Sequence, residues 1–249
     1  MLRSSKELHG YPIEALDGQI GHLDQFYFNG KNWGIRYMVI NVGNWLNRKQ
    51  VLISPQSFES PTPAVLPAKL FKEQIEKSPD IDTDKPVSRA RELELHSYYG
   101  WVNFWDTSHY IGPAPMPVEP MVVREQQQNE EEKARSEPDN NLRSSREVVG
   151  YHIHAADREI GHVDDFIVDT EQWALRYLVI DTRNWLPGRK VLVATDWVDD
   201  ITWSESMIYS SLTSASIQSA PEFNPDELVN REYEEIIYDY YGRPRYWIR

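Results

Sequence analysis

The sequence predicts a mainly β protein made of two related domains, and three observations support this prediction. Residues 2–53 align without a gap on residues 142–193, and 25 of the 52 aligned positions are identical. Each repeat contains three segments rich in β-branched and aromatic residues, a composition typical of strands. Each repeat then ends in a segment with helical periodicity. Because the period is so long, it indicates a duplicated domain rather than a short solenoid repeat.

Three strands are expected in each repeat, in the same order. They cover residues 20–29, 33–42 and 51–55 in the first repeat, and residues 160–169, 173–182 and 191–195 in the second. Between the second and third strands, Pro187-Gly188 suits a type II turn, whereas the first repeat has Asn47-Arg48 at this place. Several short strands at this spacing favour a small barrel or sandwich.

A helix is expected near the end of each repeat, where residues 89–105 align on residues 231–247. Gly242 predicts the end of the second helix, and Gly100 predicts the end of the first, which Pro86 would begin. In the second repeat, apolar and aromatic residues with helical spacing fall on one predicted face: Val229, Tyr233, Ile236, Ile237 and Tyr240.

The repeats are separated by residues 112–140, which are rich in Pro, Glu and Gln. Such a segment buries too little apolar surface to fold alone, so we expect a solvated tether. A short helix formed against a partner is the alternative. The expected domains are therefore residues 1–111 and residues 141–249, each ending in a helix and an aromatic tail.

Composition limits the compartment and the partners. The chain has no cysteine, which excludes disulfides, thiolate metal sites and cysteine nucleophiles. No apolar run approaches the length of a membrane-spanning helix, and the repeat begins at the N-terminus without a signal peptide. We therefore expect a cytoplasmic protein. Its net charge of −13 disfavours nucleic acid and anionic lipid as partners, and residues 141–249 alone carry −8.

Motifs shared by the two repeats resemble the PRC-barrel domain, which is named after the cytoplasmic part of the H subunit of photosynthetic reaction centres. The motifs read I-G-H-(L/V)-D, then W-x-(I/L)-R-Y-(M/L)-V-I-(N/D), then N-W-L followed by V-L-(I/V). The segments S-P-D-I-D (78–82), A-P-E-F-N (220–224) and Y-Y-G-R-P-R-Y-W (240–247) look like those of bacterial tandem PRC-barrel proteins. The resemblance implies a partly open, strongly bent β-barrel in each repeat.

What the resemblance implies about function is an assembly or adaptor role. Members of the PRC-barrel family include the reaction-centre H subunit and a ribosome-maturation factor. This chain differs from the first because it has no N-terminal membrane helix. It differs from the second in its acidity and in having no N-terminal domain of that kind.

Histidines and aspartates supply the candidate chemistry. His22-x-Asp24 and His162-x-Asp164 recur in both repeats, and residues i and i+2 share a strand face, so each pair has the spacing for a metal or a proton relay. We favour the alternative, in which Asp24 and Asp164 are structural groups that bind backbone amides.

A metal site is the second candidate. His152, His154 and His162 would form a divalent metal site if His162 approached the other two across a hairpin. The first repeat has Pro12 and Glu14 in place of the first two, so the fold does not need them. We expect exposed histidines, no metal and no cofactor.

The R-Y and N-W-L motifs are expected to be structural. Arg36 and Arg176 lie between apolar neighbours, and we expect them to pair with Asp24 and Asp164, respectively. Trp45 and Trp185 are expected in the core, like most aromatic residues. The alternative for these residues is an exposed anchor of a binding surface, where Trp, Tyr and Arg are enriched.

The aromatic tails are the best candidates for interaction. Trp105, Tyr246 and Trp247 follow the two predicted helices, and we expect them to be anchors for a protein partner. The alternatives are packing of one barrel on the other and a homodimer interface.

The sequence thus favours a non-catalytic adaptor or scaffold. It has no nucleophile elbow, P-loop, dinucleotide fingerprint or zinc-protease motif, so we do not expect an enzyme. Two alternatives stay open. One is a peripheral subunit of a membrane electron-transfer assembly, held at the inner membrane through a partner. The other is a small-ligand or metal-binding module.

Overall fold

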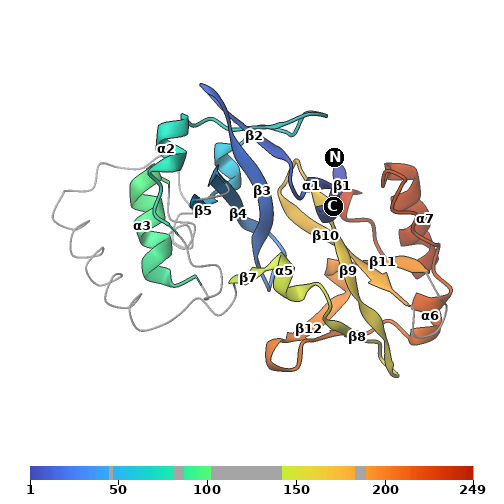
Figure 1. Cartoon of the computed structure of the whole chain (residues 1–249). Helices are drawn as coiled ribbons and strands as arrows, with labels where there is room; N and C mark the ends of the chain where they lie inside the picture. The colour runs from blue at the N-terminus through green and yellow to red at the C-terminus, as the bar shows by residue number, and fades with distance from the viewer. Residues whose placement is uncertain (45–46, 81–86, 102–141, 183–188, 249) are drawn as a thin grey trace, which may run out of the picture.

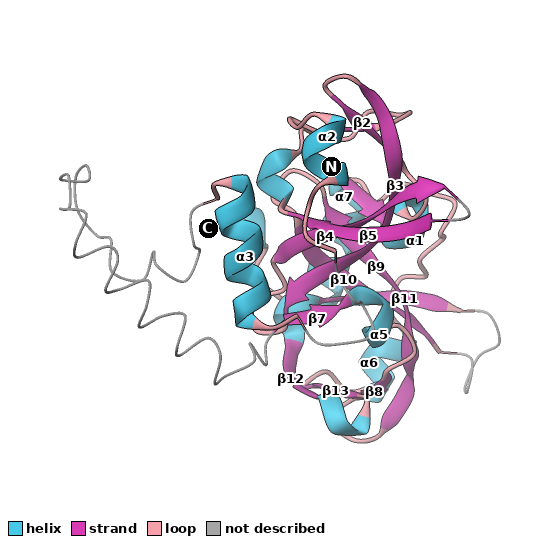
Figure 2. Ribbon diagram, turned by 60° about the vertical axis from the view of Figure 1, so that its left-hand side comes forward, coloured by secondary structure: helices cyan, strands magenta, loops and turns pink. Residues whose placement is uncertain are grey.

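The computed structural model describes residues 1–44, 47–80, 87–101, 142–182 and 189–248. Within these residues the protein is mainly β, as predicted. Thirteen strands form two mixed sheets, and the two longest helices lie at opposite ends of the molecule (Figure 1). Figure 2 shows the strands in the middle, with helix α3 along one side.

The first sheet is built mostly from the first repeat. Its strand order is β5-β4-β3-β2-β6, with β7 paired to β3 beside this path. The strands are β2 (Pro12–Ala15), β3 (Gly18–Asn29), β4 (Ile35–Asn44), β5 (Asn47–Ile53), β6 (Leu66–Pro67) and β7 (Leu142–Ser144).

The second sheet is built mostly from the second repeat and has the order β11-β10-β9-β8-β13-β12, with β1 paired to β9. The strands are β1 (Leu2–Ser4), β8 (His152–His154), β9 (Glu159–Asp169), β10 (Ala174–Asp181), β11 (Lys190–Ala194), β12 (Val198–Thr202) and β13 (Met207–Ser210). Among the described strands both sheets are open, and neither closes into a barrel. The six central strands match those predicted, whereas the short strands β1, β2, β6 to β8, β12 and β13 were not predicted.

Helices cover the ends of the sheets. They are α1 (Ser5–Leu8), α2 (Lys72–Glu76), α3 (Arg89–Tyr99), α5 (Ser145–Val148), α6 (Ser214–Gln218) and α7 (Arg231–Tyr241), with short 3-10 turns η1 (Pro55–Ser57), η3 (Thr195–Trp197), η4 (Trp203–Glu205) and η5 (Tyr246–Ile248). Gly100 and Gly242 end α3 and α7 in the left-handed conformation, which confirms the two predicted stops. Pro86 lies outside the described residues.

The predicted apolar face of α7 was partly wrong. Ile237 and Tyr238 are buried, but Ile236 is 50% exposed and Tyr240 is 40% exposed. Glu234 instead points inward, because its carboxylate accepts hydrogen bonds from Tyr177 and Tyr246. The packed face is therefore rotated away from the face that periodicity alone selected.

The repeats exchange their N-terminal strands. Strand β1 of the first repeat pairs with β9 of the second, with Leu2 opposite Asp169 and Ser4 opposite Ile167. Strand β7 of the second repeat pairs with β3 of the first in the equivalent register, since Leu142 lies opposite Asn29. We call residues 2–8 and 142–148 the two arms. Figure 1 shows β7 and α5 beside β3, and β1 and α1 beside β9 and β10.

The arm sequence explains why it docks. Ser4 and Ser144 each cap the short helix that follows by accepting hydrogen bonds from two backbone amides. The capped turn directs Leu8 and Val148 inward, where they are 1% and 0% exposed. Burial of such side chains stabilises each docked arm by about 2 kcal/mol per side chain.

The two repeats also meet along a seam. Gly34 and Ala174 form an antiparallel bridge, Ile35 N donates to Trp173 O over 2.8 Å, and Leu175 N donates to Trp33 O over 2.9 Å. Trp33 and Trp173 both have positive φ, 59° and 49°, a strained conformation for a bulky residue. Equivalent strain in both repeats indicates that the seam requires this turn. The main hydrophobic core contains side chains of both repeats, so the described parts of the two repeats pack as one body.

The glycine of the I-G-H motif is explained by close strand contact. A Cβ on Gly21 would lie 2.2 Å from Asn41 O, and one on Gly161 would lie 2.2 Å from Asp181 O. Both glycines are therefore required where the long strand crosses its neighbour. None of the helices in the described part of the chain has the length and apolarity needed to span a bilayer.

Candidate interaction site at the seam between the repeats

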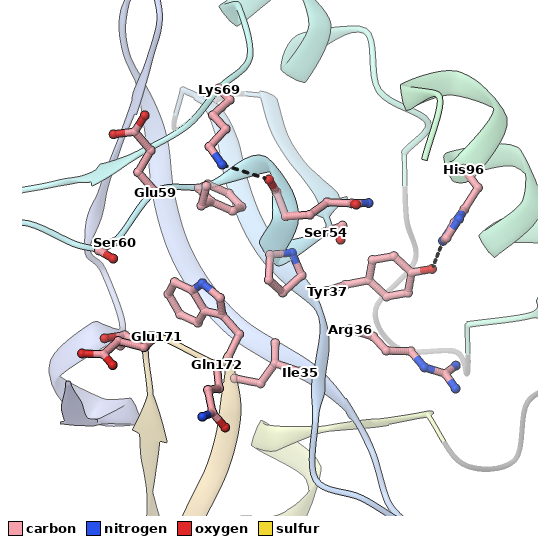
Figure 3. Close-up of a pocket in the computed structure, with 15 residues that line it drawn as sticks. Ile35, Arg36, Tyr37, Ser54, Glu59, Ser60, Lys69, His96, Glu171 and Gln172 are labelled. Atoms are coloured by element: carbon pink, nitrogen blue, oxygen red, sulfur yellow. Dashed lines mark hydrogen bonds between the residues drawn. The ribbon is translucent and has the colours of Figure 1, made fainter. Parts of the chain in front are cut away.

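A groove runs along the seam and has walls from both repeats. Its volume is about 640 Å³. One wall is the start of β4 with turn η1 and the segment that follows, and the other is the β9–β10 turn, residues 170–173 (Figure 3). Because neither repeat supplies both walls, the groove exists only in the assembled two-repeat body. We call it the seam groove.

The apolar part of the seam groove is formed by Ile35, Pro55, Phe58 and Trp173. Phe58 is buried, whereas Trp173 is half-buried and leaves part of its indole toward the groove. The equivalent Trp33 is only 6% exposed, and its ring stacks on Phe28 with centroids 5.3 Å apart. The two seams therefore differ, although the backbone of both turns is the same.

Two buried polar contacts lie below the groove. Arg36 Nη1 lies 3.3 Å from Glu92 Oε1, and the glutamate is fully buried. The hydroxyl of Tyr37 lies 2.9 Å from Nε2 of His96, as Figure 3 shows. These contacts fix β4 to helix α3 and hold the groove wall in place.

Charges of both signs surround the groove. Lys69 and Glu59 lie on one side, and Glu171 lies on the other, bound to the N-terminal amine over 2.9 Å. Lys69 donates to the backbone oxygen of Gln56 over 3.4 Å. Because the charges at the rim have both signs, they do not create an electrostatic potential of one sign that would select a strongly charged ligand.

The equivalent place in the second repeat is covered by the chain itself. The ring of Tyr246 lies 4.5 Å from the guanidinium of Arg176, the equivalent of Arg36. Trp247 packs edge-on against Tyr238, the equivalent of His96, with centroids 5.1 Å apart. Tyr246 and Trp247, two of the three residues predicted as partner anchors, are thus half-buried against their own repeat.

A buried glutamate organises this second site. Glu234 Oε1 accepts hydrogen bonds from Tyr177 over 2.8 Å and from Tyr246 over 3.0 Å, and Arg231 lies 2.9 Å from its other oxygen. Burial first, and then the Glu234 carboxylate, raise the pKa of Tyr246 to about 12. The same causes raise the pKa of Tyr177 far above its usual range. Both tyrosines therefore stay protonated donors at neutral pH.

The comparisons with known proteins bear on this second repeat. Residues 141–207 match the model of the PRC-barrel domain. The match runs from the second arm through β12 and includes the long strand with Asp164. A comparison with curated proteins finds no match.

Within the segment that matches the PRC-barrel model, Asp164 binds lysine side chains, and its predicted pairing with Arg176 was wrong. Asp164 binds Lys190 over 2.7 Å and Lys6 of the opposite arm over 2.8 Å. Arg176 instead lies 3.4 Å from Asp169. The reason is a bulge: Asp164 has no cross-strand partner between Val163 and Asp165, so its side chain turns toward the arm.

The first repeat shows the same arrangement. Asp24 is the extra residue between Leu23 and Gln25, and it binds Arg146 of the other arm over 2.6 Å. Gln50 also donates to it over 3.2 Å. Arg36 pairs with Glu92 and does not take the predicted place beside Asp24. Each structural aspartate therefore holds the arm of the other repeat.

The histidines do not gather into a metal site. His162 does lie opposite His152 across the β8–β9 hairpin, as the sequence suggested. However, His152 binds Glu159 over 2.6 Å, and the ring of His154 packs against Tyr209. In the described part of the chain, no three His, Asp or Glu side chains are placed to hold a metal ion.

Three predicted residues, Trp45, Trp105 and Trp185, lie outside the described residues. The residues that sequence reasoning missed are Glu92 and Glu234, which lie under the two seam sites. The signal was available, because the aligned helices R-A-R-E and R-E-Y-E keep a glutamate at the same place.

Proposed function

We propose that this protein is a non-catalytic adaptor, that both repeats are PRC-barrel modules, and that a partner protein binds in the seam groove. The observation that carries the proposal is the seam groove itself, whose walls come from both repeats and include Trp173 and Tyr37.

The residues that line the groove support protein binding. Trp, Tyr and Arg are the residues most enriched among those that dominate interface energetics, and Trp173, Tyr37 and Arg36 line this groove. Its mixed rim charges and the acidic chain disfavour a phosphate-rich ligand.

Rigid construction also supports this role. The exchanged arms and the shared core fix one wall relative to the other. A preformed site binds more tightly because less conformational entropy is lost on association. The two repeats therefore act as one platform for a partner.

The test is affinity capture from native cells, with soluble and membrane fractions analysed separately. Gln56 is exposed at the groove, so Gln56→Trp should obstruct it without disturbing the core. The matched control is Asp196→Trp at the equivalent exposed position of the second repeat. We expect a stoichiometric partner that Gln56→Trp reduces at least about tenfold and that the control retains.

Recovery of the same partner with both variants would contradict the groove as the binding site. Recovery of the protein without a partner from either fraction would contradict the adaptor function itself. A partner found in the membrane fraction would define an assembly at the membrane surface.

A further inference from the structure

The contacts between the arms and the long strands have an approximate two-fold symmetry. Arg3 of the first arm lies opposite Val168 on β9, and Arg143 of the second arm lies opposite Phe28 on β3. These positions are equivalent, because the two repeats align without a gap here. Each arm therefore docks on the other repeat in the same register, as identical subunits do in an isologous dimer.

The polar contacts of the two arms repeat in the same way. Lys6 of the first arm binds the bulged Asp164 over 2.8 Å, and Arg146 of the second arm binds the bulged Asp24 over 2.6 Å. In both arms a serine hydroxyl also donates a hydrogen bond to the residue after the bulge. None of these contacts depends on how the chain connects an arm to its site. A second copy of the chain therefore offers each arm a site of the same chemistry.

A glycine joins each arm to the body of its repeat. Gly10 and Gly150 have positive φ, 78° and 96°, a conformation that glycine adopts far more readily than other residues. An added Cβ would meet no atom within 4 Å at either position. Packing therefore does not hold these two glycines in place, and a change of their backbone angles would direct an arm elsewhere. We call residues 9–11 the hinge of the first arm.

The arm site on β9 is the stronger of the two. Asp165 on β9 accepts hydrogen bonds from the hydroxyls of both Ser4 and Ser5. The equivalent residue on β3 is the neutral Gln25, which accepts a hydrogen bond from Ser144. Hydrogen bonds to an ionised carboxylate are roughly twice as strong as those between neutral groups. An arm that belongs to another chain binds without the help of a covalent connection, so β9 is the better site for it.

We infer that β9 binds the first arm of a second copy of this chain, so that two copies associate by exchanging residues 2–8. The contacts of the docked arm are kept in the exchanged pair, because each arm leaves one site and enters an identical one. The hinge gives the chain's own arm an effective concentration on the order of mM. We therefore expect single copies in dilute solution and exchanged pairs where copies are concentrated. This inference is independent of the seam groove.

The test uses pairs of single-cysteine variants, because the natural chain has no cysteine. Arg3→Cys places a thiol on the arm, and Val168→Cys places one opposite it on β9. The two variants are mixed at about 1 mM in a thiol redox buffer, and disulfide-linked heterodimers are quantified by mass spectrometry. In the matched control, Val191→Cys replaces the second variant, since Val191 is equally buried but lies on β11, beside β10 rather than beside an arm. We expect at least about tenfold more heterodimer from the register pair than from the control.

The hinge supplies a second measurement. Alanine at position 10 is strained at the φ of 78° in the single copy, and an exchanged arm leaves that conformation. We expect Gly10→Ala, added to both cysteine variants, to raise the heterodimer yield at least about fivefold. Gly150→Ala lies in the equivalent place before the body of the second repeat, and we expect it to leave this yield unchanged.

Equal yields from the register pair and from the Val191→Cys control would overturn the inference. A yield that Gly10→Ala fails to raise would also overturn it, because general opening of the sheet would then be the source of the disulfide. A wild-type dimer that is seen by light scattering and abolished by Gln56→Trp would place the second copy in the seam groove, which likewise overturns arm exchange.

Discussion

The two seams have the same backbone frame but differ in how far their tryptophans are buried. In both repeats the tryptophan turn has positive φ and pairs with the other repeat, and in both a glutamate of the last helix is buried beneath the Arg-Tyr motif. Yet Trp33 is buried while Trp173 lines a groove. The duplicated positions preserve the frame, and the positions that diverged, His96 against Tyr238 among them, set the surface.

The difference extends to the buried networks. Glu234 accepts hydrogen bonds from Tyr177 and Tyr246, so the tail is part of the core network of the second repeat. In the first repeat, Tyr37 contacts His96, and Glu92 is bound by Arg36. Within the described residues, the two buried glutamates are held by different groups: Arg36 in the first repeat, and Tyr177, Tyr246 and Arg231 in the second.

The largest expected effect tests a feature that both repeats share, which is the close strand contact at Gly161 and Gly21. Gly161→Ala places a Cβ 2.2 Å from a backbone oxygen, so the strands must separate. We expect the free energy of unfolding to fall by about 3 kcal/mol or more, measured by urea denaturation. Gly21→Ala should have a similar effect.

Gly34→Ala is the matched control, because the second repeat already carries Ala174 at this place and φ is not positive. It should change stability by less than about 1 kcal/mol. An equal loss in Gly34→Ala and Gly161→Ala would show that any added methyl group near the seam is harmful and that the close strand contact is not the cause.

The difference between the seams is tested by removing the tail. Tyr246→Ala combined with Trp247→Ala deletes two half-buried rings and one hydrogen bond to Glu234. We expect a loss of about 3 kcal/mol in unfolding free energy. The loss is measured by urea denaturation, as for the glycine variants.

Ile248→Ala is the control for this variant, because that side chain is 70% exposed and should contribute less than about 0.5 kcal/mol. Wild-type stability in the double variant would mean that the tail is not part of the folded second repeat.

The smallest effect concerns the arm contacts. Asp164→Asn weakens charge-assisted hydrogen bonds to Lys190 and Lys6, and we expect a loss of about 1–2 kcal/mol at neutral pH. Burial raises the pKa of Asp164, but the hydrogen bonds from Lys190 and Lys6 outweigh it, so the pKa lies below its ordinary value of 3.8. The carboxylate therefore stabilises the fold fully above that value and loses this contribution as the pH falls through the lowered pKa.

The measurement is unfolding free energy from pH 7 to pH 2 for wild type and Asp164→Asn. The difference between them should shrink in the most acidic part of this range. A difference that stays constant with pH would show that the charge of Asp164 does not hold the arm.

Periodicity and duplication were enough to predict the central strands, the two terminal helices and their glycine stops. They were not enough for the partners of charged groups. Arg36 was expected beside Asp24 because both recur in each repeat, but recurrence does not say which repeat supplies the partner. A bulge turns each aspartate toward the other repeat, and a bulge depends on strand pairing that a local pattern does not encode.

The sequence by itself determined the duplicated mainly β frame, because strand composition, helical spacing and glycine stops are local properties that each repeat carries twice. Only the tertiary structure decided that the arms cross over, that Tyr246 packs on Arg176, and that residues of both repeats line one groove. The arms of the repeats begin with the same Leu-Arg-Ser-Ser sequence, so either repeat offers each arm similar local contacts. Which repeat each arm binds depends on chain connectivity and on the shared core, and both are properties of the whole molecule.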